Sequence, residues 1–442
     1  MGAISMLSEK KIKDSPSLLS AVSILGAFMT YFSMYAFRKP FTAAEYEGLA
    51  MLGVNFKILL IVSQVLGYTL SKFVGIQLIS SLPASARISY ILGLLGMSWL
   101  ALLVFAVVPP SLKVVAIFFN GLPLGLIWGL VFAFLEGRQK TELLAAGLAS
   151  SFIVSSGVVK SIGLELILKG VDTFWMPFLT GLIFLPMLLL GVWLLTRIPP
   201  PSAADQEARS ERQPMSRQDR RSFFLRFAPG IVLVTLIYMA LNAYRDFRDN
   251  FAVEIWGALG FADQPEMLAW TEIPVAVVVL LMTALLIWVK SNQKAFYLNF
   301  VIILSGGVIL MATTFFFQQN QLSPVLWMIS VGFGMYAAYI AYHAVLFERW
   351  IALFRDKSNI GFLMYIADAF GYLASVGVLM FKNFGYRQMS WLNFFTAISY
   401  GTGILCVLLS GLAIAYFRTK EKKIKQNRVQ PPPEKAYAPS HS

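Results

Sequence analysis

Residues 198–224 read IPPPSAADQEARSERQPMSRQDRRSFF, a polar and basic stretch near the middle of the chain. Three consecutive prolines open it, and Arg220 and Arg221 lie near its end. The sequence on either side consists mainly of long hydrophobic runs, so the hydropathy pattern is interrupted here once. This interruption predicts two hydrophobic halves joined by a polar loop.

The composition is that of a membrane protein. Hydrophobic residues make up 57% of the 442 residues and charged residues only 13%, whereas soluble domains carry about 25% charged residues. A helix needs about 20 apolar residues to cross about 30 Å of hydrocarbon, and runs of that length predict twelve transmembrane helices, six in each half. The predicted spans are 17–39, 56–80, 86–108, 112–136, 142–168, 173–197, 225–250, 268–290, 294–317, 322–348, 357–382 and 390–418.

The two halves show weak internal similarity. Residues 37–41 (FRKPF) align with residues 247–251 (FRDNF) at an offset of about 210 residues. In the fifth predicted helix of each half, Gly147, Gly157 and Gly163 align with Gly361, Gly371 and Gly377. Two parallel six-helix repeats form the major facilitator fold, with the substrate site at the midplane between the halves.

The sequence therefore predicts an all-α polytopic protein with two pseudo-symmetric six-helix bundles. The predicted divisions are an N-terminal bundle at 1–197, a central cytoplasmic loop at 198–224, a C-terminal bundle at 225–418 and a basic cytoplasmic tail at 419–442.

The net charge of +13 is distributed as membrane topology requires, and we expect no nucleic-acid partner. With a cytoplasmic N-terminus, most of the 36 Lys and Arg residues fall in predicted inner segments. The positive-inside rule then places both termini in the cytoplasm, in a plasma membrane such as the bacterial inner membrane. The tail has the composition of a disordered segment, and either contact with anionic lipid or plain topology explains its charge.

Catalytic and metal-binding motifs are missing from the sequence. The single cysteine, Cys406, excludes an intramolecular disulfide, and two histidines without a CxxC motif make a zinc site improbable. The chain has no glycine-rich phosphate loop and no nucleophile elbow. We expect neither an enzyme nor a cofactor, and we expect a monomer whose partners are a small-molecule substrate and membrane lipids.

Charged residues within the predicted spans are the candidate functional residues, because each costs about 2.5 to 3.5 kcal/mol at the bilayer centre. The bases are Arg38, Lys72, Lys160, Arg245 and Arg248. The acids are Asp246, Asp249, Glu272 and Asp368, all in the second half. Bases without nearby acids should face a wet cavity, pair with the other half, or bind an anion.

Helical spacing groups further polar residues with these charges. Tyr31 and Tyr35 share one helix face with Arg38. Two stripes have the spacing of a cavity lining: Tyr336, Tyr339 and His343, and Tyr365, Asp368, Tyr372 and Ser375.

Structural roles explain some of these residues equally well. Arg38 comes late in its helix and could extend to the interface. Arg245 and Asp249 are spaced for an intrahelical pair. The tyrosines could be packed with satisfied hydroxyls, and a lone histidine such as His343 is more often a core residue than a proton relay.

Two segments resemble the organophosphate and inorganic phosphate antiporters of the major facilitator superfamily, which include the sugar-phosphate exchangers. Residues 31–40 (YFSMYAFRKP) are similar to the tyrosine-rich first helix of that family, which ends in Arg-Lys. Residues 67–73 (GYTLSKF) are similar to its Ser-Lys-Phe in the second helix, and Asn120-Gly121 fits the fourth helix. The resemblance implies that Tyr31, Tyr35, Arg38 and Lys72 contact a phosphate-bearing substrate. It also implies an arginine in the seventh helix, for which Arg248 and Arg245 both remain candidates.

Two features depart from that family. Residues 79–83 (ISSLP) replace its charged loop signature after the second helix. Its histidine in the fifth helix is missing, with Ser155, Ser156 and Lys160 nearby instead. The chain is therefore expected to belong to a divergent, uncharacterised bacterial branch.

These observations predict a secondary active transporter that moves a small anionic, phosphorylated metabolite by antiport. The expected substrate-binding residues are Tyr31, Tyr35, Arg38, Lys72, Arg245 and Arg248. The expected coupling or cavity residues are Lys160, Glu272, Tyr339, His343 and Asp368. A proton-coupled symporter, with Asp368 or Glu272 carrying the proton, and a non-transporting membrane sensor are the alternatives.

Overall fold

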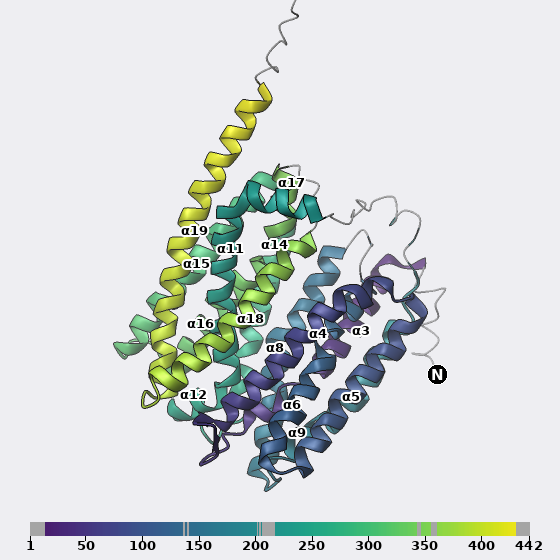
Figure 1. The fold of residues 1–442 in the computed structure, drawn as a ribbon, viewed down its shortest axis with the longest axis vertical. Coiled ribbons are helices and arrows are strands. Elements are labelled where there is room, and N and C mark those ends of the chain that lie inside the picture. The colour runs from purple at the N-terminus through teal and green to yellow at the C-terminus, as the bar shows by residue number, and fades with distance from the viewer. Residues whose placement is uncertain are drawn as a thin grey trace, which may run out of the picture.

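The computed structural model consists almost entirely of helices (Figure 1). It describes residues 14–135, 138, 141–200, 202, 205, 217–342, 346–354 and 360–429. The helices of the N-terminal half are α3 (Pro16–Ala36), α4 (Phe56–Ser81), α5 (Arg87–Val107), α6 (Pro110–Leu124), α7 (Ile127–Phe132), α8 (Thr141–Leu168) and α9 (Met176–Thr196). Those of the C-terminal half are α11 (Arg217–Asn250), α12 (Ala252–Ala258), α13 (Met267–Trp270), α14 (Glu272–Ile287), α15 (Asn292–Gln318), α16 (Pro324–Ala341), α17 (Phe347–Phe354), α18 (Ile360–Gly385) and α19 (Trp391–Val429).

Short elements occupy some of the connections. Two 3-10 helices, η1 (Pro40–Ala43) and η2 (Ala84–Ala86), follow α3 and α4. The strands β1 (Ala50–Met51) and β2 (Val54–Asn55) form an antiparallel hairpin in which Ala50 pairs with Asn55.

Each predicted span coincides with a described helix or with two consecutive ones. Ten described helices are long and apolar enough to cross a membrane. The helices at the second and eleventh predicted spans, α4 and α18, are each 26 residues long. The predicted all-α polytopic membrane fold is confirmed, and the count of twelve spans stays a prediction.

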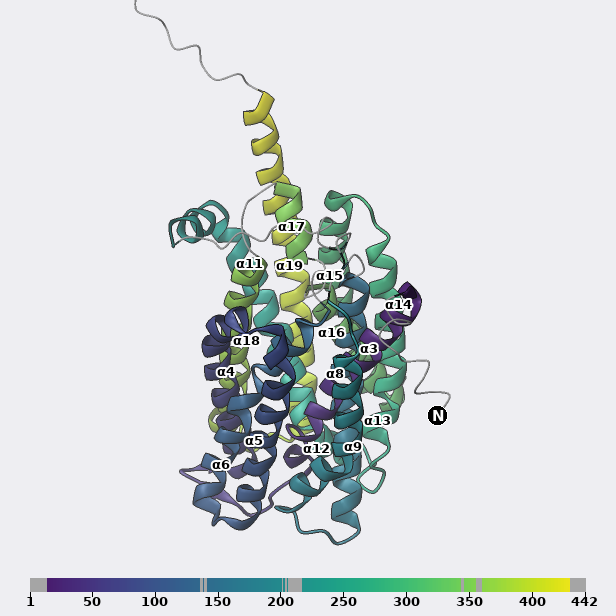
Figure 2. The same ribbon diagram turned by 90° about the vertical axis from the view of Figure 1, so that its right-hand side faces the viewer.

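Helices pack in the same order within each half. In the N-terminal half α3 packs on α8 and α9, and α6 packs on α4 and α5. In the C-terminal half the corresponding helices do the same: α11 packs on α18 and α19, and α16 packs on α14 and α15. This repeated pairing gives the two halves the same internal arrangement, and they lie side by side as two bundles (Figures 1 and 2).

The halves meet along two interfaces. On one, α8 contacts α13 and α14, and on the other α4 contacts α18. Helices α12 and α17 lie at opposite ends of the molecule (Figure 1).

Several helices differ from the prediction in where they begin, end or divide. Helix α11 begins at Arg217 rather than 225, because Phe223 and Phe227 pack on Trp350 of α17. Helix α19 continues to Val429, beyond the predicted end at 418, where Glu421 accepts a hydrogen bond from Tyr297 and pairs with Lys425. The predicted fourth span is divided after Leu124, next to the helix-internal Pro123, and the eighth is divided at Thr271.

Candidate functional site

The segment after α3 is fixed by side chains of neighbouring helices. Helix α3 ends at Ala36, so the carbonyls that follow lack their usual helical donors. Asn120 Nδ2 donates to the carbonyl of Phe37 at 2.8 Å, and Gln64 Nε2 donates to that of Arg38 at 2.8 Å. Gln64 also bonds Asn120, at 2.6 Å. A backbone break of this kind inside a membrane bundle needs such replacement donors.

Arg38 is buried without an acidic partner among the described residues. Only 8% of its surface is exposed, and its Nε atom has no hydrogen-bond partner. Its guanidinium carbon lies 4.2 Å from the ring centroid of Tyr68 and 5.8 Å from that of Tyr35. Stacking on aromatic rings leaves the hydrogen-bonding edge of a guanidinium available to an anion.

Arg38 lines a central cavity between the two halves. The lining residues are Tyr35, Arg38, Lys39, Phe152, Arg245, Asp246, Asp249 and Tyr336. The cavity has a volume of about 20 Å³, room for roughly one or two water molecules. The cavity is therefore small in this structure.

Arg245 enters the same cavity from α11. It lies 4.4 Å from the ring centroid of Tyr339 and pairs with Asp246 at 2.8 Å. The spacing had suggested a pair between Arg245 and Asp249, but the carboxylate of Asp249 is taken up by bases of the other half. The structure thus places Arg38 and Arg245 together, each against a tyrosine ring.

Asp249 is the most heavily contacted acid of the site. Lys39 Nζ lies 2.5 Å from one carboxylate oxygen, and Lys160 Nζ lies 2.7 Å from the other. Ser156 donates to the same oxygen as Lys160, and Lys160 also donates to the backbone carbonyl of Asp249. The sequence prediction did not include Lys39 among the candidate site residues, although it directly follows Arg38.

Arg248 points to a second cavity, on the side of the first that faces α13 and α14. It pairs with Glu272 at 2.7 Å and donates to the carbonyl of Met328 at 3.1 Å. This cavity is also lined by Lys160, and it shares Asp249 and Tyr336 with the central one. Arg38 and Arg248, which are equivalent in the internal repeat, therefore line different cavities.

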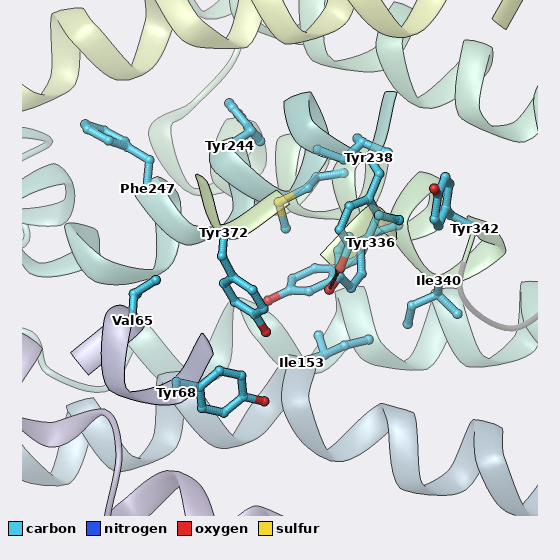
Figure 3. Packing of buried hydrophobic residues seen from close by; sticks show 14 of the residues in the cluster. Val65, Tyr68, Ile153, Tyr238, Tyr244, Phe247, Tyr336, Ile340, Tyr342 and Tyr372 are labelled. Atoms are coloured by element: carbon cyan, nitrogen blue, oxygen red, sulfur yellow. Dashed lines mark hydrogen bonds between the residues drawn. The ribbon is translucent and has the colours of Figure 1, made fainter. Parts of the chain in front are cut away.

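Lys72 and Asp368 form an ion pair between α4 and α18. Their charged atoms are 2.5 Å apart, and Tyr238 donates to the other oxygen of Asp368 at 2.6 Å. The Lys72 ammonium lies 5.4 Å from the ring centroid of Tyr68 and 5.3 Å from that of Tyr372. Figure 3 shows Tyr68 and Tyr372 from the two halves facing each other, with Tyr238 nearby.

The remaining predicted site residues lie close to this group. Tyr31 is buried and its ring contacts those of Tyr35 and Trp128. Tyr339 stacks on Tyr238. His343 lies outside the described residues.

Bases outnumber acids among these charges. Arg38, Lys39, Lys72, Lys160 and Arg245 face Asp246, Asp249 and Asp368, while Arg248 and Glu272 balance each other. Lys39 and Lys160 share the carboxylate of Asp249, and Arg38 has no paired carboxylate in the described part of the chain. The site therefore has a net positive charge in which a small anion would be the missing partner.

Fold and site together define a polytopic α-helical membrane protein with a small, charged cavity between two halves. A family model described as a family of unknown function (DUF5690) matches residues 40–420, so the chain belongs to that family. No curated protein matches the sequence.

Solved structures of transporters share the fold. The structure of a D-xylose-proton symporter matches with a TM-score of 0.57 and 15% identity, covering 89% of this chain and 96% of that one. A mutant of the nucleoside transporter NupG matches with a TM-score of 0.58 and 13% identity, covering 90% of this chain and 100% of that one. The major facilitator fold expected from the sequence is thereby confirmed.

Proposed function

We propose that the protein is a secondary active transporter that moves a small anionic metabolite by alternating access. One observation carries the proposal: Arg38 is buried between the halves with no carboxylate partner in the described structure. A buried charge is costly unless something compensates it. A bound anion would supply that compensation, and the fold shared with transporters supports a carrier.

The guanidinium groups of Arg38 and Arg245 favour a phosphate or carboxylate ligand. Arginine binds such groups through two parallel N–H···O bonds, and both arginines line one cavity. Because two positive charges attract a dianion more strongly than a monoanion, a phosphorylated substrate fits best. The resemblance to phosphate antiporters favours exchange as the transport mode, with both termini in the cytoplasm.

Ion pairs between the halves support alternating access. Lys57, at the start of α4, pairs with Glu254 of α12 at 2.5 Å, and Lys72 pairs with Asp368. Fifteen residues of helix separate these two lysines, about 22 Å along the axis. Arg38, stacked on Tyr68, lies between the two levels, so ion pairs join the halves at two depths around the cavity.

A ligand screen tests the proposal. Purified protein in detergent would be screened for thermal stabilisation by phosphorylated metabolites, nucleotides and carboxylates. A ligand at 100 times its dissociation constant adds about 2.7 kcal/mol of stability. We expect an anionic hit that stabilises the parent and the Lys382→Met control but not Arg38→Ala. Lys382 is an equally buried base that lines neither cavity. Hits that stabilise Arg38→Ala as well as the parent would refute the assignment.

Proton-coupled symport is the second candidate, and a specific observation favours it. Glu272 is a buried carboxylate that lines the second cavity, and its Oε2 atom has no hydrogen-bond partner among the described residues. Reconstituted vesicles separate the two modes. Exchange gives counterflow without a pH gradient, whereas symport acidifies the vesicle lumen as substrate enters. A protein that does neither with a bound ligand would be a sensor.

A further inference from the structure

The ion pairs that join the two halves share one polarity. Four of them link described residues: Lys39 with Asp249, Lys160 with Asp249, Lys57 with Glu254, and Lys72 with Asp368. In each pair the N-terminal half supplies the base and the C-terminal half supplies the acid. The acids of the C-terminal half therefore pair with lysines that would also attract an incoming anion.

Asp249 is the acid for which this competition is direct. Its carboxylate and the Lys39 ammonium line the same cavity as Arg38 and Arg245. It also lines the second cavity, where Lys160 and Ser156 hold its other face. An anion bound to Arg38 would therefore lie within the same small space as Asp249, and two like charges at such distances repel strongly.

We propose that Asp249 is an internal counter-ion that occupies the anion site of the empty carrier and is displaced from Lys39 when a phosphate-bearing or carboxylate-bearing substrate binds. This inference rests on the proposed function and adds a residue that competes with substrate. The oxygen of the substrate takes the place of one carboxylate oxygen on the same ammonium group.

Displacement of Asp249 would also loosen the contact between the halves. Helices α8 and α13 approach closely here, since a Cβ atom on Gly157 would lie 2.0 Å from the carbonyl oxygen of Leu268. Lys160, on the same helix as Gly157, is anchored to Asp249. A substrate that displaces Asp249 from Lys39 removes one of the two ion pairs that Asp249 makes with the other half, next to this close contact, which connects the anion site to closure of the interface.

The pair of Lys57 and Glu254 provides a matched control. It joins the same two halves with the same polarity at 2.5 Å, but neither residue lines either cavity. Removing the charge of Glu254 changes the net charge of the C-terminal half by the same amount as removing that of Asp249. Only Asp249 should compete with a bound anion.

Titration of inorganic phosphate into detergent-purified full-length protein tests the inference, with calorimetry or thermal shift as the readout. We expect Asp249→Asn to bind phosphate about tenfold more tightly than the parent or better, because one charge-assisted competitor is removed. Glu254→Gln should bind like the parent. Equal tightening in both variants would indicate a general charge effect and overturn the proposal, as would unchanged or weaker binding in Asp249→Asn.

Further outcomes separate this inference from the proposed function. If the parent binds phosphate and Asp249→Asn binds it no more tightly, Asp249 is not a competing counter-ion, while the proposed anion carrier stands. If only Asp249→Asn binds phosphate, the counter-ion role and the proposed anion carrier are both supported. If neither the parent nor Asp249→Asn binds phosphate, both the counter-ion role and the proposed anion carrier are refuted, because lysines freed from Asp249 then attract no anion. If Asp249→Asn does not fold, Ser156→Ala replaces it and should tighten phosphate binding by about fivefold, one neutral hydrogen bond to the carboxylate being lost. No gain in that variant would overturn the inference.

Discussion

Replacing Arg38 with methionine should stabilise the empty protein while abolishing its response to substrate. Arg38 is 8% exposed and has no carboxylate partner in the described structure, so its charge is desolvated without compensation. Replacing buried charged groups by apolar side chains of similar volume is often stabilising by about 1 to 4 kcal/mol. Loss of the stacking on Tyr68 offsets this by about 0.5 to 2 kcal/mol. We expect a net gain of about 1 to 2 kcal/mol.

Lys72→Met gives the comparison, because it removes a base of similar depth that does have a partner. Asp368 would keep the hydrogen bond from Tyr238 and lose its ammonium at 2.5 Å. Removing one partner of a fully buried pair costs about 3 to 5 kcal/mol, and this pair, whose side chains are 21% and 15% exposed, should cost less but still destabilise the protein. Arg38→Met and Lys72→Met should therefore shift the stability of the protein in opposite directions.

Thermal unfolding of both variants in detergent, with and without the ligand found by screening, measures these shifts. Arg38→Met should unfold at a higher temperature than the parent and show no ligand-induced rise. Lys72→Met should unfold at a lower temperature. If Arg38→Met is destabilised as strongly as Lys72→Met, Arg38 is a structural residue, and the inference of an anion site from its missing partner is refuted.

Three other changes test the site and the topology. Arg38→Lys should weaken substrate binding by about tenfold to a hundredfold, because the charge stays and the two-pronged contact of about 1.5 to 3 kcal/mol is lost; binding equal to the parent in a direct titration would contradict it. Asp368→Asn and Glu272→Gln should abolish uptake driven by a proton gradient if symport holds, and full transport by both across pH 5 to 8 would eliminate that mode. Cysteines introduced at Ser210 and Gln430 should resist impermeant reagents in intact cells, since both segments are predicted to be cytoplasmic; labelling from outside would reverse the topology.

The sequence alone determined the class of fold. Hydrophobic runs of about 20 residues have one stable form in a bilayer, the helix, because the backbone must satisfy its own hydrogen bonds there. The interruption at 198–224 and the repeat at Phe37 and Phe247 predicted two equivalent bundles, and the helix pairing agrees. Charged residues in apolar runs could be recognised as candidates because burial makes each of them costly.

Tertiary structure alone decided which charges meet. Helical spacing relates residues within one helix and suggested Arg245 as the partner of Asp249, but Lys39, in the segment after α3, and Lys160, on α8, pair with it instead. The repeat suggested that Arg38 and Arg248 share a site, yet Arg248 pairs with Glu272 and lines a neighbouring cavity. Coulomb energy depends on distance in space, and the packing of α8 on α13 and α14 and of α4 on α18 sets those distances. Among the described residues, Arg38 was left with tyrosine rings and no carboxylate, and only the assembled bundles could show that.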